Sequence, residues 1–166
     1  MGLRIDAATS DDVASILALV RELAEFEQLA HEVVATEAQV AASLFGSRRV
    51  AECALARVDD ALAGFALWFH SYSTFLGRPG IYLEDLYVRP QYRGHGTGRA
   101  LFRHVAGLAL AGGGGRMEWS VLDWNSRAIA FYESLGAQPL RGWTVYRLTG
   151  DALQRAGHGG RAEEDQ

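Results

Sequence analysis

The chain is predicted to fold as one α/β (α+β) domain with a mixed sheet flanked by helices. Strand-like and helical segments alternate in the order strand, two helices, several antiparallel strands, then strand–helix–strand–helix–strand. Its 166 residues are 49% hydrophobic, which suits a single core of ordinary size. No repeat or linker divides the chain. We therefore expect one domain over residues 1–155 and a disordered, Gly- and Arg-rich tail over residues 156–166.

Composition and charge exclude several classes of partner. The net charge is −4 and the basic residues are scattered, which argues against nucleic acid. The longest apolar run, residues 61–69, is too short to cross a bilayer, and the first residues lack a secretory apolar core. Cys53 is the single cysteine, so no internal disulfide can form, and we expect a cytoplasmic location. We interpret Cys53 as a packed small hydrophobe, not as a nucleophile.

The first half of the chain is predicted to contain three strands and two helices. A Thr9-Ser-Asp-Asp segment precedes the first helix, and Thr36-Glu-Ala-Gln forms a capping box for the second, which ends at Gly46. Asp59-Asp60 joins two strands in a hairpin. The expected elements are strand 3–7, helix 13–29, helix 36–46 and strands 50–58 and 62–72.

The next strand, residues 81–88, carries two adjacent acids, Glu84 and Asp85. In a regular strand, one face would hold Leu83, Asp85 and Tyr87, and the other Tyr82, Glu84 and Leu86. Adjacent acids in an apolar strand cost folding energy unless they are partnered or line a cleft. They form either a capped or salt-bridged pair near an edge, or a negative wall for a cationic amine.

A glycine-rich turn follows this strand and opens a helix. It reads Arg93-Gly-His-Gly-Thr-Gly98, and apolar residues then recur at helical spacing to Ala109. Glycines allow close approach of a ligand to the backbone, and a helix N-terminus favours an anion, most often a phosphate. A Walker loop is excluded because the chain has no lysine, and a dinucleotide fingerprint fails at Arg99. His95 is expected to contribute only its amide.

The last third is predicted to contain a strand, a helix, a final strand pair and a short helix. The strand spans residues 117–121 and the helix opens at Asn125 and ends at Gly136. The strand pair is expected over residues 138–148, around Arg141-Gly142, and a short helix could begin at Thr149.

These motifs, taken in order, resemble the GCN5-related N-acetyltransferases (GNAT), in the diamine (spermidine/spermine) and thialysine acetyltransferase branch. They are Tyr82-Leu-Glu-Asp-Leu-Tyr-Val88, Tyr92-Arg-Gly-His-Gly-Thr-Gly98, Trp124-Asn125 and Phe131-Tyr132. The resemblance implies a mostly antiparallel sheet of about seven strands, splayed at its central parallel pair, where acetyl-CoA lies. It also implies a β-bulge in strand 81–88 and a homodimer formed through the late strands.

The resemblance further implies acetyl-CoA as cofactor and a set of residues that bind it. Backbone N–H groups of the glycine turn would hold the pyrophosphate, with Arg93 and Arg99 as charge partners, and an N–H near residues 86–88 would face the thioester oxygen. The expected set is Leu86, Tyr87, Val88, Arg93, Gly94, His95, Gly96, Thr97, Gly98, Arg99, Asn125, Ala128 and Tyr132. Asn125 can serve as a helix N-cap and bind the cofactor at once.

Two residues are expected to perform the chemistry of direct transfer in a ternary complex. Glu84, directly or through water, would accept the proton of the amine, and Tyr132 would protonate the leaving thiolate. On its helix face alone, Tyr132 is better interpreted as a core aromatic. The spacing from Asn125 and the upstream loop favour the catalytic role.

The expected substrate is a small cationic amine bound by acids. The predicted contacts are Phe26, Glu27, Glu84 and Asp85, although Glu27 could equally be a solvated surface residue. Arg141 would repel a long polyamine, so thialysine or lysine fits at least as well. No metal site is expected, because His31, His70 and His104 lie on different elements. Two alternatives remain, a noncatalytic acyl-CoA-binding module and a protein or peptide N-acetyltransferase.

Overall fold

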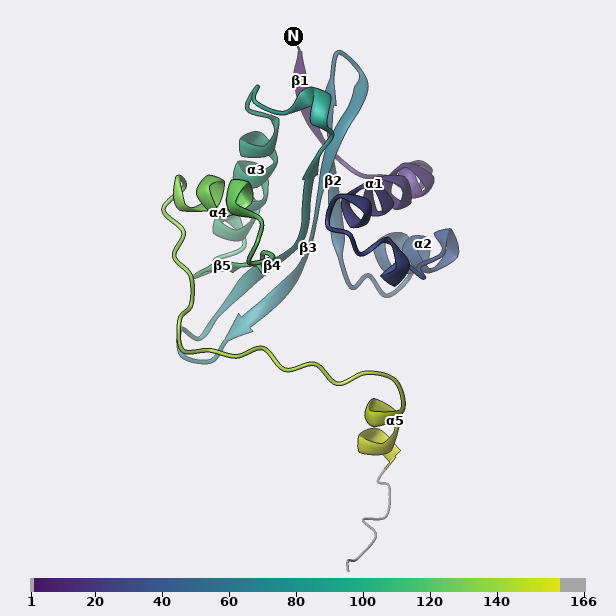
Figure 1. The fold of residues 1–166 in the computed structure, drawn as a ribbon, viewed down its shortest axis with the longest axis vertical. Helices are drawn as coiled ribbons and strands as arrows, with labels where there is room; N and C mark the ends of the chain where they lie inside the picture. Colours follow the sequence, from purple (N-terminus) through teal and green to yellow (C-terminus); the bar gives the residue numbers. More distant parts are fainter. Residues whose placement is uncertain (1, 159–166) are drawn as a thin grey trace, which may run out of the picture. The chain divides into compact units, whose positions relative to one another are not determined.

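The computed structural model describes residues 2–158, and its contacts divide the chain into two compact units, Met1–Asp123 and Trp124–Gln166. In the first unit the elements are β1 (Leu3–Ala7), η1 (Ser10–Asp12), α1 (Val13–Phe26), η2 (Ala30–Glu32), α2 (Glu37–Phe45), β2 (Glu52–Val58), β3 (Ala61–Ser73), β4 (Arg78–Val88), η3 (Pro90–Tyr92), α3 (Thr97–Ala111) and β5 (Met117–Glu118) (Figure 1). The second unit contains α4 (Ser126–Glu133) and α5 (Gly150–His158).

The first unit is built on one mixed sheet with strand order β1-β2-β3-β4-β5. All neighbours are antiparallel except β4 and β5, which run parallel. The predicted hairpin is confirmed, because β2 and β3 meet at Asp59 and Asp60, which have φ of 47° and 65°. This left-handed pair is the backbone that a tight two-residue hairpin requires. The prediction of about seven strands is corrected to five among the described residues.

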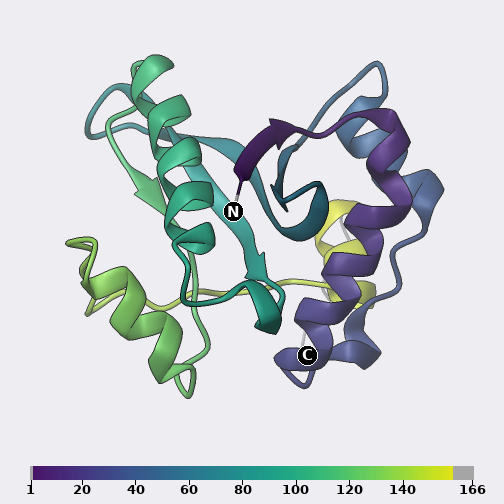
Figure 2. The same ribbon diagram turned by 90° about the horizontal axis from the view of Figure 1, so that it is seen from above.

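Helices cover both faces of this sheet, α3 on one face and α1 with α2 on the other (Figures 1 and 2). On the first face, Leu101 of α3 is buried in a cluster with Leu83 of β4. On the second face, Ile16 of α1 and Leu44 of α2 are buried in a cluster with Tyr87 of β4. Strand β4 therefore contributes to both cores, so its C-terminal end is held between the two helical layers.

The ends of α1 and α2 are set by local hydrogen bonds. Thr36 caps α2 in the predicted capping box, which Gln39 completes. Helix α1 ends at Phe26, three residues earlier than predicted, because Gln28 adopts a φ of 61°. The amide of Gln28 donates to the Glu25 carbonyl, and the amide of the following leucine donates to Ala24, as in a Schellman motif. Glu27, the C-cap, is thereby held at a defined position.

The second unit departs from the prediction at its strands. Asn125 caps α4 as expected, and a terminal helix, α5, follows Thr149. The strand pair predicted over residues 138–148 is wrong, since this segment has no strand pairing, and β5 ends at Glu118 instead of residue 121. An alternating apolar pattern predicts a strand only where another strand can pair with it. Of the predicted tail, residues 156–158 belong to α5 and the rest lies outside the described residues.

No helix within residues 2–158 is long and apolar enough to span a membrane.

Candidate active site

The centre of β4 contains a β-bulge. Leu67 and Trp68 are consecutive in β3, yet they pair with Asp85 and Leu83, so Glu84 is the extra residue. This is the feature that the family resemblance implied for the strand. A bulge of one residue reverses the alternation of side chains on either side of it.

The bulge changes which residues share a face, so the side-chain alternation of a regular strand does not hold across it. Leu83 and Leu86 both pack against the α3-side cluster, whereas Tyr87 lies in the α1/α2-side cluster. Asp85, two residues before Tyr87 and paired with Leu67 of that second cluster, faces α1.

Glu84 lies on the same face as Asp85. Leu67 lies on the α1/α2-side face, and so does Phe69, two residues further along β3. The Tyr82 ring stacks on Phe69, which puts Tyr82 on this face, and Glu84 follows Tyr82 by two residues. The two acids that a regular strand would separate are thus brought together.

Glu27 at the end of α1 belongs to the same negative region. The pKa of Asp85 is raised to about 7 by burial and by the neighbouring charges of Glu84 and Glu27. Burial also raises the pKa of Glu27. Glu84 itself is exposed, whereas Asp85 and Glu27 are half-buried. The three carboxyls therefore share one electrostatic environment that favours a cation, and Asp85 titrates close to neutral pH.

An aromatic pair beside these acids was not identified from the sequence. The rings of Phe69 and Tyr82 stack with centroids 5.1 Å apart. The Tyr82 hydroxyl lies 2.7 Å from Oγ of Ser120. Ser120 is 38 residues away in the chain, and no spacing in the sequence could have linked it to β4.

The parallel pair β4–β5 diverges directly before the acids. Its register covers only Ile81↔Met117 and Tyr82↔Glu118, so among the described residues the β5-side edge of β4 has no strand partner from Leu83 to Val88. This agrees with the splayed pair that the resemblance implied. An open strand edge offers main-chain groups to an extended ligand, and it includes the predicted contacts Leu86, Tyr87 and Val88.

The glycine turn has an open backbone that can approach an anion closely. Gly94 and Gly96 have φ of 83° and 87°, and no atom lies within 4 Å of a Cβ built at either one. Thr97 begins α3 with only 2% of its surface exposed, while His95 and Arg99 are exposed. The first turn of α3 has amides without intrahelical partners, so the open turn and the helix N-terminus together form an anion seat.

The side chain of Arg93 has partners inside the protein. Its Nε donates to the Val88 carbonyl at 2.7 Å, and its guanidinium lies over two rings, 5.0 Å from the centroid of Phe26 and 5.5 Å from that of Tyr87. An interaction of the Arg93 side chain with a phosphate, as expected from the sequence, would compete with these contacts. The backbone of Arg93 remains the first residue of the turn.

A second arginine holds the same end of β4. Arg89 donates through Nη2 and Nε to the carboxylate of Glu22 in α1, with the shortest distance 2.7 Å, and through Nη1 to the Leu62 carbonyl at 2.9 Å. No spacing in the sequence signals this ion pair, which joins residues 67 positions apart.

The remaining predicted residues lie on α4 in the second unit. The side-chain oxygen of Asn125 accepts a hydrogen bond from the Ala128 amide at 3.2 Å, which confirms its capping role. Tyr132 follows almost two turns later, with its ring centroid 5.3 Å from that of Phe131. Their roles in binding and catalysis stay predictions.

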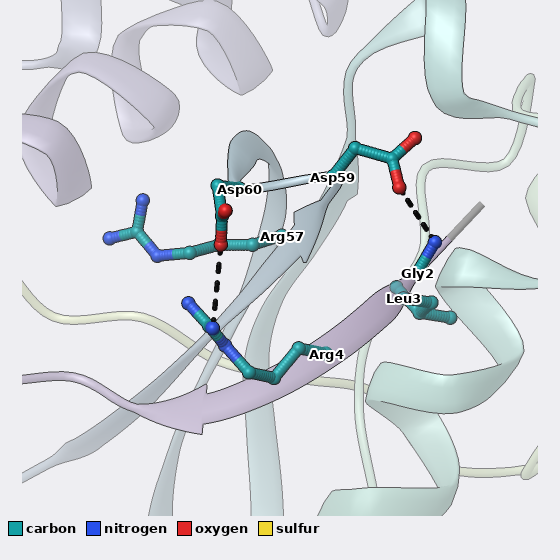
Figure 3. A pocket seen from close by; sticks show the side chains of 6 residues that line it. All are labelled: Gly2, Leu3, Arg4, Arg57, Asp59 and Asp60. Atoms are coloured by element: carbon teal, nitrogen blue, oxygen red, sulfur yellow. Dashed lines mark hydrogen bonds and ion pairs between the residues drawn. The ribbon is translucent and has the colours of Figure 1, made fainter.

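A depression at the far edge of the sheet contains none of the predicted residues. It is lined by Gly2, Leu3, Arg4, Arg57, Asp59 and Asp60 (Figure 3). Arg4 pairs with Asp60 at 3.4 Å, and the Gly2 amide donates to Asp59 at 2.7 Å. These contacts secure the N-terminal strand to the β2–β3 turn.

Within the described part of the chain, no group of three or more His, Cys, Asp or Glu side chains could hold a metal ion. Cys53 is buried, and burial together with the charges of Asp85 and Asp12 raises the pKa of its thiol to about 12. It is therefore protonated at neutral pH, as a packed small hydrophobe should be.

Comparison with known proteins places this geometry in context. The profile described as the Acetyltransferase (GNAT) family matches residues 17–137. The chain is 40% identical to the thialysine N-epsilon-acetyltransferase of Mus musculus over 162 residues, which cover 91% of this chain and 95% of the relative. It is 36% identical to the L-ornithine N5-acetyltransferase NATA1 of Arabidopsis thaliana over 196 aligned positions, covering 91% and 86% of the two chains.

Solved structures show the same fold. An integron cassette protein from the mobile metagenome of V. cholerae superposes with a TM-score of 0.78 at 25% identity, covering 95% of this chain and 98% of that one. A ribosomal-protein-alanine N-acetyltransferase from Brucella melitensis biovar Abortus 2308 superposes with a TM-score of 0.72 at 19% identity, covering 90% and 100%. The latter likeness bears on the fold alone.

Proposed function

The chain belongs to the acetyltransferase (GNAT) family and is an amine N-acetyltransferase, and we propose that it transfers the acetyl group of acetyl-CoA to a primary amine of a small cationic substrate. The observation that carries the proposal is the β4 bulge, which brings Glu84 and Asp85 to one face beside Glu27. These acids adjoin a strand edge that is open from Leu83 onward. A cationic amine and an extended thioester therefore meet at one place on β4.

Binding and orientation rest on main-chain groups. The amides of the glycine turn and of the first turn of α3 would hold the pyrophosphate of acetyl-CoA. When bound, acetyl-CoA supplies the acetyl group as an activated thioester. An N–H of residues 86–88 donates to the thioester oxygen as negative charge develops there. One aimed donor of this kind contributes about 3 kcal/mol to transition-state stabilisation.

Proton transfer rests on side chains. A free alkylamine has a pKa of about 10.4, so it arrives as an ammonium ion and must lose a proton before attack. Glu84, or Asp85 with its pKa of about 7, accepts that proton directly or through water. The amine nitrogen then bonds to the carbonyl carbon and the C–S bond breaks. Tyr132 donates a proton to the departing thiolate, and the second proton that the attacking nitrogen loses restores the Tyr132 hydroxyl.

The substrate class we propose is a lysine-like amine such as thialysine, with small diamines next. Four thialysine N-epsilon-acetyltransferases lie among the relatives, at 34–40% identity. A cluster of three acids suits one compact ammonium group, whereas Arg141 disfavours a long polyamine.

We also propose a cytoplasmic homodimer. The single cysteine supports a reducing compartment. The late segment supports self-association, because Trp143, Val145 and Tyr146 are 78%, 87% and 92% exposed, and such patches mark interaction sites. Light scattering of the purified protein tests the dimer, and a monomer at micromolar concentration would overturn it.

The experiment that tests the function measures thiol release from acetyl-CoA across thialysine, lysine, ornithine, diamines, polyamines and a lysine peptide. We expect turnover with thialysine or a small diamine. Tight acetyl-CoA binding without thiol release on any amine would instead indicate a noncatalytic acyl-CoA-binding module. Turnover confined to the peptide would indicate a protein N-acetyltransferase.

A further inference from the structure

We propose that Arg93 is a positioning residue that couples the acetyl-CoA turn to the amine-binding end of α1, so that a ligand at either place strengthens binding at the other. The inference rests on the proposed function and extends it, because it concerns how the two halves of that site communicate. Arg93 is the first residue of the turn, yet its side chain contacts only β4 and α1 among the interactions described above.

The contacts of Arg93 reach two elements, β4 and α1. Its Nε donates to the carbonyl of Val88 at the end of β4, 2.7 Å away. Its guanidinium lies 5.5 Å from the ring of Tyr87, which is buried in the α1/α2-side cluster, and 5.0 Å from the ring of Phe26, the last residue of α1. A planar guanidinium can donate in its plane and stack with its faces at the same time.

Phe26 is directly followed by Glu27, one of the three acids. The Schellman hydrogen bonds around Gln28 hold Glu27 rigidly to the helix end, so a shift of Phe26 carries Glu27 with it. The side chain of Arg93 therefore connects the glycine turn to the carboxyl of Glu27, the proposed contact of the amine.

Helix α1 is also held one turn before its end, by an ion pair with Arg89, the residue that follows β4. Arg89 pairs with Glu22 one turn earlier and also binds the Leu62 carbonyl. The Arg93–Phe26 contact thus governs only the last turn of α1, where 40% of the Phe26 surface is exposed. A weak contact at the end of an anchored helix can order or release that end without unfolding the helix.

Coupling follows from this arrangement. Phosphate bound to the turn restrains the backbone of Arg93, which holds its guanidinium between the two rings and orders the end of α1. An amine that contacts Glu27 then binds beside an end of α1 that is already ordered, so its binding costs less conformational entropy. By linkage, the amine strengthens CoA binding by the same factor.

Hydrogen exchange with CoA alone tests the proposal without needing turnover. In the wild-type protein we expect saturating CoA to slow exchange in residues 93–100 and also in residues 22–29. In Arg93→Met the turn should stay protected while the protection of residues 22–29 is lost. Phe26→Leu, which leaves the turn intact and keeps an apolar side chain, should give the same result if Arg93→Met folds poorly.

Arg21→Met is the matched control, because Arg21 is an exposed residue of the same helix. In this variant, CoA should still slow hydrogen exchange in residues 93–100 and in residues 22–29. Equal protection of residues 22–29 in wild type and Arg93→Met, or none in wild type despite a protected turn, would overturn the proposal. Absence of any CoA protection at the turn would instead reject the proposed function, and the inference with it.

Titration calorimetry supplies the second measurement. In wild type we expect saturating thialysine to tighten CoA binding about fivefold, the lower end of typical coupling. In Arg93→Met the ratio of CoA affinities with and without amine should fall to about one, whatever the CoA affinity of the variant in the absence of amine. A ratio that is unchanged by Arg93→Met would contradict the proposal.

Discussion

At the scale of single residues, Asp85 differs from an ordinary surface carboxyl in its titration. Burial is the largest cause of its raised pKa, followed by the charges of Glu84 and Glu27. The protein therefore keeps a group half ionised near neutral pH that would be almost fully ionised in water. That property suits a residue that accepts a proton from an amine and must release it afterwards.

The raised pKa has a consequence for stability. In the unfolded chain the pKa of Asp85 returns to about 3.8, so the unfolded state loses this proton first as the pH rises. The contribution of Asp85 to the free energy of unfolding therefore falls progressively between pH 4 and pH 7. Urea titrations should show that Asp85→Asn flattens this fall, while the exposed Asp123→Asn leaves it unchanged. Parallel curves for wild type and Asp85→Asn would show that Asp85 titrates normally.

Tyr132 should act on the chemical step and not on cofactor binding. We expect Tyr132→Phe to lower kcat with the favoured amine more than tenfold, because the thiolate then leaves unprotonated, while acetyl-CoA affinity changes little. Steady-state thiol release and calorimetry measure the two quantities. The neighbouring Phe131→Leu serves as a control for packing on the same helix. Unchanged turnover would identify Tyr132 as a core aromatic.

At the scale of elements, the end of α1 carries a strained residue. Gln28 holds a φ of 61°, a conformation that glycine adopts more readily than residues with a Cβ. Gln28→Gly should raise the free energy of unfolding by about 0.5–1 kcal/mol, whereas Gln28→Ala should not. Thermal unfolding of the three proteins gives the comparison. A loss of stability in Gln28→Gly would mean that the glutamine side chain itself stabilises this turn.

The glycine turn should respond in binding more than in stability. A Cβ at Gly96 meets nothing within 4 Å, but its φ of 87° disfavours any other residue. Gly96→Ala should therefore shift the turn and weaken CoA binding about tenfold, corresponding to about 1.4 kcal/mol. Gly107→Ala, in open space on α3 at ordinary φ, is the control and should bind CoA normally. Equal affinities would exclude the turn as the pyrophosphate seat.

Signals within short segments of the sequence predicted most of the elements, whereas features that depend on pairing between distant segments could not be predicted from them. The Thr36 capping box, the Asp59-Asp60 hairpin and the glycine turn are each encoded within six residues, so the sequence reveals them. The β4 bulge depends on register against β3, which periodicity cannot show. Periodicity alone therefore puts Glu84 and Asp85 on opposite faces, and the bulge was implied only by the resemblance to a family.

At the scale of the whole molecule, the candidate site depends on residues that fold together from distant segments. Glu27, Asp85 and the glycine turn belong to α1, β4 and the start of α3, and their common location was implied by the resemblance to a family, not by their spacing. The contacts of Arg93 and of Ser120 had no signal in the sequence at all. The late strand pair was wrong because its apolar pattern lacks a pairing partner among the described residues.

On the proposed function, the bulge makes Glu84 and Asp85 one carboxyl pair that serves the amine. Steady-state kinetics of Glu84→Gln/Asp85→Asn with thialysine and acetyl-CoA test it most directly. We predict a fall in kcat/KM for the amine of more than about 100-fold, with the KM of acetyl-CoA within threefold of wild type. A double variant that retains wild-type kcat/KM for the amine would show that these two carboxyls do not serve the amine.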